Sequence, residues 1–222
     1  MCGRFALSAP SRAIQKHFDL KEEVFYTPRY NIAPDQEVAV VRVEEKEHRL
    51  CRMRWGFVPH WSRDSRIGYK MINARSETLH EKPSFKEAFK TSRCLIPADG
   101  FYEWKKISGR KDKQPYFVRM GDGSLFSFAG LWSSWTDTSS GEVLRTCTII
   151  TTEPNALLAE IHDRMPVIVN RNQYGLWLNS KAKADELRLL FRPFDPGLMT
   201  TYPVSTLCNN AANDSRQCIE MK

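Results

Sequence analysis

The chain has 222 residues, of which 41% are hydrophobic and 27% charged, a composition typical of soluble globular proteins. This length fits one large domain or two small ones, and no run approaches the roughly 20 apolar residues that a membrane-spanning helix needs. The net charge of +7 favours a polyanionic partner such as nucleic acid, although many basic proteins bind none.

The first half of the chain predicts short helices and strands. The N-terminal Met-Cys-Gly-Arg-Phe carries a charge and precedes no apolar stretch, so we expect no signal peptide and a cytoplasmic location. A serine start and apolar spacing predict a helix over 11–20. Residues 37–43 and 50–57 are typical of strands joined by a charged turn, and 83–90 is typical of a helix.

The second half predicts more strands. We expect an extended segment over 94–104 with a turn at 98–100, a hairpin with a polar tip over 107–114, strands over 125–135, 146–152 and 165–169, and helices over 153–163, 172–178 and 183–191. Short strands with interspersed helices favour an α+β fold with a curved, barrel-like, mainly antiparallel β core and peripheral helices. No repeat or linker divides the chain, so we expect a single domain over 1–222.

The cysteines give no sign of a metal site. The chain has 6 of them, none in a CxxC pair and none at zinc-finger spacing from a histidine. We therefore expect free thiols and no metal or other cofactor. Cys94 and Cys147 lie in apolar, strand-like runs and are interpreted as core residues.

Cys2 differs because removal of Met1 would leave it as the N-terminal residue. A cysteine followed by glycine is small enough for methionine aminopeptidase. The product carries an α-amine with a pKa of about 7.7–8.0 next to a thiol with a pKa of about 8.5, so both are partly deprotonated near neutrality. Such a 1,2-aminothiol condenses with aldehydes through an imine to a five-membered thiazolidine. Met-Cys alone is also found at disordered termini without any such role.

Asn73 and Arg75 alternate with apolar residues in the segment 71–79. On an extended chain both polar side chains face the same side. Asn73 suits the positioning of a nucleophile and Arg75 suits a phosphate. A turn or a capped helix start is the alternative.

Glu103 lies between two aromatic residues in the segment 98–106. An apolar setting raises the pKa of a carboxyl group and makes it a general acid near neutrality, while Trp104 offers a stacking surface. The alternative is an exposed carboxylate paired with Lys105 or Lys106. The basic run that continues to Lys113 is interpreted as a solvated hairpin tip.

His162 is placed at the end of the helix predicted over 153–163. There the helix dipole would favour its protonated form, and Asp163 or Arg164 could orient the ring. A lone histidine is more often structural than catalytic. The other four of the 5 histidines stand in polar or turn segments with no reactive group beside them.

Two loop-like segments, 29–34 and 54–61, combine arginine, proline and aromatic residues. Bases stack on exposed aromatic rings with little sequence preference. We interpret Trp55 and Phe57 as core residues and Trp61 as exposed.

The chain contains, in this order, the motifs MCGRF, RYNIAP, RWGFVPHW, INARSET, CLIPADGFYEW, TTEPN and IHDRMPVI. This ordered set, from residue 2 to about 170, resembles the SRAP family (SOS-response-associated peptidases). The resemblance implies an α+β domain around a barrel-like β core, and a positively charged groove for single-stranded DNA.

The resemblance also implies roles for individual residues. Cys2 corresponds to the residue that cross-links to abasic sites, Asn73 to the residue that positions it, Glu103 to the acid/base and His162 to a second proton-transfer residue. The expected DNA contacts are Arg4, Asn31, Pro34, Trp61, Arg75 and Trp104, the two tryptophans at the end of a duplex.

The predicted function is that of an abasic-site shield in DNA damage repair and the SOS response. The expected partner is single-stranded DNA with abasic sites, or its junction with a duplex, and the protein is expected to be monomeric and DNA-associated in the cytoplasm. The chemistry also allows lyase activity and slow self-reversal. The alternatives are a cysteine peptidase that processes itself through Cys2, Glu103 and His162, and a non-covalent reader of modified DNA.

Overall fold

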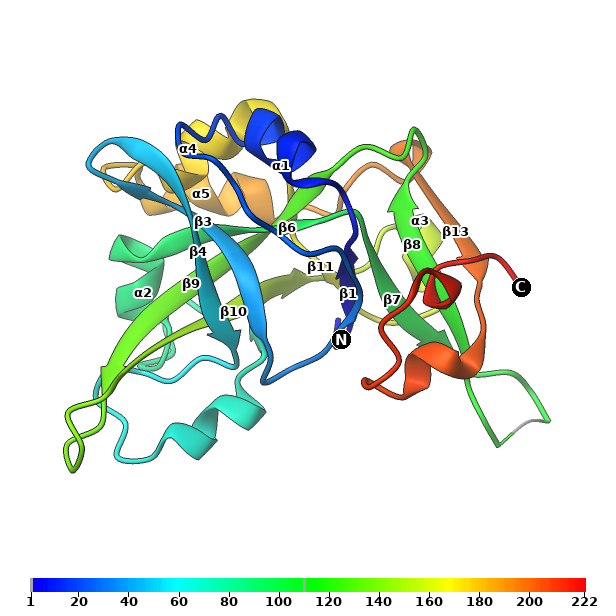
Figure 1. Cartoon of the computed structure of the whole chain (residues 1–222), viewed down its shortest axis with the longest axis horizontal. Helices are drawn as coiled ribbons and strands as arrows, with labels where there is room; N and C mark the ends of the chain where they lie inside the picture. The colour runs from blue at the N-terminus through cyan, green and yellow to red at the C-terminus, as the bar shows by residue number, and fades with distance from the viewer. Residues whose placement is uncertain (1, 110) are drawn as a thin grey trace.

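The structure is a computed structural model that describes residues 2–109 and 111–222. Its strands are β1 (Phe5–Leu7), β2 (Arg29–Ile32), β3 (Glu37–Glu44), β4 (Glu47–Trp55), β5 (Asn73–Arg75), β6 (Arg93–Ala98), β7 (Gly100–Lys105), β8 (Gln114–Met120), β9 (Phe126–Thr136), β10 (Val143–Thr152), β11 (Met165–Pro166), β12 (Ile168–Val169) and β13 (Met199–Pro203). The α-helices are α1 (Ser11–His17), α2 (Lys86–Thr91), α3 (Ala156–Ala159), α4 (Tyr174–Leu178) and α5 (Ala184–Arg188). Figure 1 shows the helices around the strands.

Five strands close on themselves into a barrel. β3 pairs with β4 and β6, β6 with β9, and β9 with β10, all antiparallel, and β10 completes the ring through a parallel pairing with β4. The short strand β5 also runs parallel to β10, with Asn73 opposite Ile149. The predicted α+β fold with a barrel-like, mainly antiparallel core is therefore confirmed.

A second sheet places β1 in contact with β7. Its order is β13-β8-β7-β1-β2, and the pairings are antiparallel. Phe5 of β1 lies opposite Phe101 of β7. β7 begins at a glycine for a steric reason, because a Cβ atom at Gly100 would meet the ring of Phe117 on β8 at 2.0 Å.

The core lies inside the barrel and under the helices. Trp55, Phe57, Cys94 and Cys147 are buried, as predicted. α1 and α4, at the top of Figure 1, meet where the ring of His17 lies 3.1 Å from the hydroxyl of Tyr174. Among the described residues the cysteines are free, and no helix is long and apolar enough to cross a membrane.

Several predicted boundaries were wrong. The helix expected over 11–20 ends at His17, and Ser11 does not cap it because its hydroxyl exchanges hydrogen bonds with the main chain of Tyr26. The helix expected over 153–163 is reduced to Ala156–Ala159, because the chain turns directly after it and enters strand pairing at Met165–Pro166. The strand expected over 165–169 is divided between β11 and β12, which pair with different strands.

The strands β1 and β2 were not predicted. The hairpin of β7 and β8 was predicted correctly, and the described residues of its basic tip are largely exposed. Arg110 of that tip lies outside the described residues.

Candidate active site

Cys2 lies immediately before β1 and is completely buried. Its thiol points toward the carbonyl oxygen of Arg4, with 3.9 Å between sulfur and oxygen. Burial raises the pKa of this thiol well above its usual value, and the negative charge of Glu103 adds to the effect. The thiol is therefore protonated in this environment at neutral pH.

Asn73 reaches Cys2 from the barrel. Its Nδ2 donates a hydrogen bond of 2.8 Å to the main-chain carbonyl of Cys2. Because β5 is paired to β10, a rigid strand of the barrel fixes the position of this amide. The side-chain oxygen of Asn73 is buried and has no hydrogen-bond partner in the described part of the chain. An acceptor is thus available beside Cys2 for a group that brings a proton.

Glu103 comes from the middle of β7. Only 2% of this residue is exposed, and burial raises the pKa of its carboxyl group to about 7. This is the direction expected for a carboxyl group flanked by aromatic residues. At neutral pH the group is shared between its protonated and ionised forms, which suits a general acid or base.

His162 faces Glu103 from the loop after α3. Its Nε2 lies 3.9 Å from a carboxylate oxygen of Glu103, and its Nδ1 accepts a 3.0 Å hydrogen bond from the main-chain N–H of Arg164. The Nδ1 atom is also 2.7 Å from Asp163, but that carboxylate is 87% exposed and acts chiefly through its screened charge.

The predicted protonation of His162 was wrong. Burial lowers the pKa of its ring, and this outweighs the attraction of Asp163. The dipole argument does not apply because the helix has only 4 residues and ends at Ala159. The lowered pKa favours the neutral form of the His162 ring at physiological pH.

Arg164 braces the loop that carries His162. Its guanidinium pairs with Glu77 and donates a 2.7 Å hydrogen bond to the carbonyl of Thr151 on β10. The side chain of Arg164 thus anchors the loop to the barrel, and its main chain orients the imidazole.

Arg4 is held from two sides. One terminal nitrogen donates to Oδ1 of Asn31 at 2.9 Å and to the carbonyl of Cys208 at 2.7 Å. The side chain of Asn31, a predicted DNA contact, is 0% exposed, and its Nδ2 donates to the carbonyls of Cys208, Asn210 and Asn213. Asn31 is a structural residue that positions Arg4.

The C-terminal segment 205–218 was missed in the sequence. Asn209 accepts a 2.8 Å hydrogen bond from the indole N–H of Trp104, next to Glu103. Asp214 accepts from the main-chain N–H groups of Tyr30 and Asn31 and pairs with Arg29. Asparagine and aspartate are common in loops, so nothing in the sequence indicated that this segment holds Arg4 and Trp104.

The remaining predicted DNA contacts lie further out. Arg75 is exposed two residues after Asn73, and Pro34 is half-buried two residues beyond Ile32, which pairs with Phe5. Pro34 follows the end of β2 that lies toward Cys2, whereas Arg75 is at the end of β5 opposite Asn73.

Trp61 is 53% exposed, as predicted, but belongs to a loop away from Cys2. The neighbouring Ser62 bonds to Trp135, which pairs with Leu144 of β10. Leu144 is five residues from Ile149, the residue of β10 opposite Asn73, which corresponds to about 17 Å along β10.

No group of three or more histidine, cysteine, aspartate or glutamate side chains that could hold a metal occurs among the described residues. The structure therefore brings Cys2, Asn73, Glu103 and His162 together without a metal-binding cluster, with Arg4 and Trp104 at the same end of β1 and β7.

Comparison with known proteins identifies the family. Residues 1–211 match the family described as SOS response associated peptidase (SRAP). The chain belongs to the SRAP family. It is 46% identical over 224 residues to the abasic site processing protein YoqW of Bacillus subtilis, with 99% of both chains covered. It is 30% identical to the abasic site processing protein HMCES of Gallus gallus, over 99% of this chain and 77% of that one.

Solved structures share this SRAP fold. A crystal structure of a protein from Bacteroides thetaiotaomicron superposes with a TM-score of 0.90 at 26% identity, over 100% of both chains. A crystal structure of a protein from Bordetella bronchiseptica has a TM-score of 0.78 at 27% identity, covering 92% of this chain and 100% of that one.

Proposed function

We propose that this protein binds abasic sites in single-stranded DNA and protects them by forming a covalent adduct through Cys2. The observation that carries the proposal is the placement of Cys2 under the amide of Asn73 and close to Glu103, a buried carboxyl group with a pKa of about 7. The names of its relatives, abasic site processing proteins, support the substrate.

The first step uses the amine of Cys2 after Met1 has been removed. An abasic deoxyribose opens in part to an aldehyde, and the amine adds to its C1′ carbon. Protonated Glu103 donates a proton to the departing oxygen, so that water leaves and an imine forms. Glu103 is left as a carboxylate for the next step, and the ring of His162, whose Nε2 lies 3.9 Å away, is placed to accept and release a proton beside it.

The second step uses the thiol. An imine makes the neighbouring C2′ proton acidic, and loss of that proton breaks the strand by β-elimination. Transfer of the thiol proton to a base and attack of sulfur on the imine carbon close a thiazolidine ring. The carbon becomes saturated and the C2′ proton is no longer acidic, so the strand is protected. Because burial keeps the thiol protonated, the carboxylate of Glu103 is the base we assign to this step.

The DNA strand is proposed to contact the basic and aromatic side chains around Cys2. Arg4 and Arg75 would bind phosphates, and Trp104, fixed by Asn209, would stack on a base. Trp61 would meet DNA further along the strand or at the end of a duplex. Because these contacts read no base edges, we expect binding with little sequence preference and a strong dependence on salt.

The test compares strand breakage on single-stranded DNA that carries one abasic site. Wild-type protein is expected to give a denaturation-resistant adduct with an intact strand. Cys2→Ala is expected to give cleavage instead, since its N-terminal amine still forms an imine but has no thiol to trap it. Binding that is unchanged in Cys2→Ala, with neither adduct nor cleavage in wild type, would instead support a non-covalent reader. Hydrolysis of added peptides without any adduct would support a peptidase.

A further inference from the structure

A cleft of about 630 Å³ opens at the other end of β1 and β7 from Cys2. The two strands are antiparallel, so Cys2 and Glu103 share one end while Ser8 and Asp99 share the other. Asp99 precedes Glu103 by four residues, which corresponds to about 13 Å along a strand. The cleft contains none of the residues of the candidate active site.

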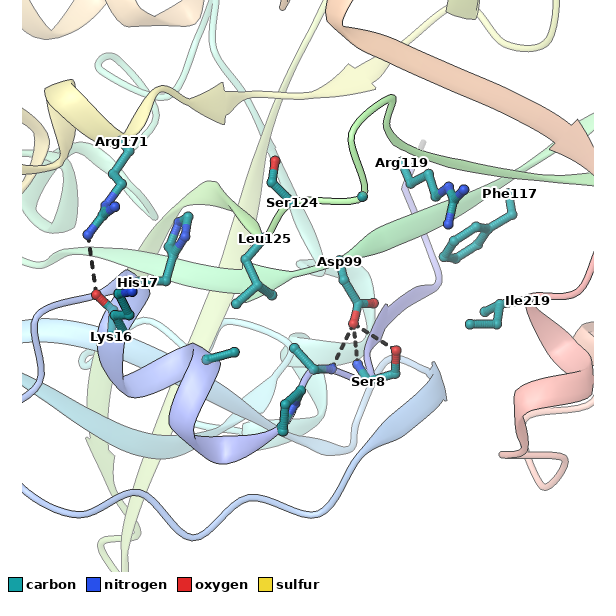
Figure 2. Close-up of a pocket in the computed structure, with 14 residues that line it drawn as sticks. Ser8, Lys16, His17, Asp99, Phe117, Arg119, Ser124, Leu125, Arg171 and Ile219 are labelled. Carbon is teal, nitrogen blue, oxygen red and sulfur yellow. Dashed lines mark hydrogen bonds between the residues drawn. The ribbon is translucent and has the colours of Figure 1, made fainter.

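Basic side chains line this cleft on two sides. In Figure 2, Lys16 and Arg171 lie on one side and Arg119 lies on the other. Arg171 donates a 3.2 Å hydrogen bond to the carbonyl of Lys16, which orients its guanidinium. Arg119 stacks at 5.6 Å over the ring of Tyr202, an arrangement that leaves the edge of its guanidinium available.

The carboxylate in the cleft, Asp99, is bound by the residues that follow β1. Oδ2 of Asp99 accepts hydrogen bonds from the main-chain N–H and the hydroxyl of Ser8 and from the N–H of Ala9, as Figure 2 shows for this side chain. Its other oxygen is buried below the surface. Asp99 therefore holds the floor of the cleft in shape, while Lys16, Arg119 and Arg171 supply positive charge on its walls, Arg171 lying also 3.8 Å from Asp19.

The wall between the cations is apolar. Ala13, Phe117, Leu125 and Ile219 line it, with the hydroxyl of Ser124 at its edge. A volume of this size, apolar walls and a few charged groups are typical of sites for small organic ligands. An inorganic anion would leave most of the apolar wall uncovered, and a neutral apolar molecule would leave the cations unused.

We propose that this cleft binds a nucleotide, with the base on the apolar wall and phosphate on Lys16, Arg171 or Arg119. Cations on both sides of one apolar surface match a nucleotide unit, whose base can lie on that surface while the phosphates on either side of its sugar reach the cations. The same chemistry is offered by a free nucleotide and by a nucleotide unit within a DNA strand. The site is separate from Cys2 and does not depend on adduct formation.

The experiment titrates wild-type protein with deoxyadenosine monophosphate (dAMP), deoxyadenosine, inorganic phosphate and an undamaged oligodeoxyadenylate, by calorimetry. Undamaged DNA has no aldehyde and cannot react with Cys2. Two variants alter the cleft: Arg119→Ala removes a cation, and Ser124→Trp fills the edge from an exposed turn. Lys90→Ala, which removes an exposed cation of α2 outside the cleft, is the matched control.

We expect dAMP to bind more tightly than deoxyadenosine or phosphate. Arg119→Ala should lower the affinity for dAMP about tenfold, as expected for the loss of a charge-assisted hydrogen bond. Ser124→Trp should abolish dAMP binding, and Lys90→Ala should leave it unchanged. If the cleft variants also weaken binding of the oligonucleotide, the ligand is a unit of a DNA strand. If they weaken binding of dAMP alone, the ligand is a free nucleotide. Absence of dAMP binding, equal binding of phosphate and dAMP, or equal effects of all three variants would overturn the proposal. None of these outcomes depends on the adduct at Cys2.

Discussion

The side-chain amide of Asn73 donates a 2.8 Å hydrogen bond to the carbonyl oxygen of Cys2. The two residues are 71 positions apart in the sequence and meet because β5 is added to the barrel next to the start of β1. This bond fixes the main chain of the proposed nucleophile, while the amine and the thiol remain to react.

Replacement of Asn73 should slow adduct formation without unfolding the protein. Asn73→Ala removes one hydrogen bond, and we expect the rate to fall up to about tenfold. Asn73→Asp places a carboxylate oxygen against the carbonyl oxygen of Cys2, and we expect its rate of adduct formation to be lower still. The rate is measured by quenched time courses on denaturing gels, with the exposed Asn170→Ala as control. Equal rates for wild type and both Asn73 variants would refute a positioning role.

The rate of adduct formation should pass through a maximum between pH 7 and 8. Below this range the amine of Cys2, with an ordinary pKa of about 7.7–8.0, is protonated. Above it, Glu103, with its pKa raised to about 7, has lost the proton that it donates. Glu103→Gln should lower the rate about 100-fold and remove the alkaline decline. A wild-type rate that keeps rising to pH 9 would contradict this assignment.

The raised pKa of Glu103 also predicts the pH dependence of stability. Between about pH 4.5 and pH 7 the folded carboxyl group binds a proton that the unfolded one does not, so its contribution to stability is lost as pH rises through about 7. The free energy of unfolding of wild type relative to Glu103→Gln should fall by about 3 kcal/mol from pH 4 to pH 8. Urea titrations at several pH values measure it, and a difference that does not vary with pH would show that burial does not shift this group.

The C-terminal segment should affect DNA binding through Arg4 and Trp104. Asp214→Ala leaves the N–H groups of Tyr30 and Asn31 without their acceptor and should cost about 1–3 kcal/mol of stability. The exposed Asp112→Ala should cost nothing measurable.

Asn209→Ala should spare stability and weaken binding to single-stranded DNA, because the Trp104 ring loses its orientation. Fluorescence anisotropy with undamaged DNA separates the two variants. Unchanged binding in Asn209→Ala would exclude a positioning role for this residue.

The fold class and the group formed by Cys2, Asn73, Glu103 and His162 were predicted from the sequence for different reasons. Apolar, strand-like runs indicated the long barrel strands, and the aromatic neighbours of Glu103 indicated its burial as one of two interpretations. The ordered motifs led to the SRAP family. The pairing of β5 with β10, which brings Asn73 to Cys2, is a long-range contact with no local signal.

Other features depend on tertiary contacts that the sequence does not display. The segment 29–34 was interpreted as a DNA-binding loop, yet Asn31 is buried because residues 208–213 fold over it. The protonation of His162 was predicted from a helix that proved too short, and burial decided its pKa instead. The cleft beside α1 is formed by parts of the chain between Ser8 and Ile219 and has no motif of its own.

Intact-protein mass spectrometry after mixing with single-stranded DNA that carries one abasic site tests the central claim most directly. Wild type and Cys2→Ala are compared after Met1 removal has been verified by mass. The account predicts a heat-stable species equal to the Met-less protein plus the DNA minus one water, in wild type alone. Wild type that has lost Met1 and still forms no adduct, or an equally stable adduct in Cys2→Ala, would contradict it.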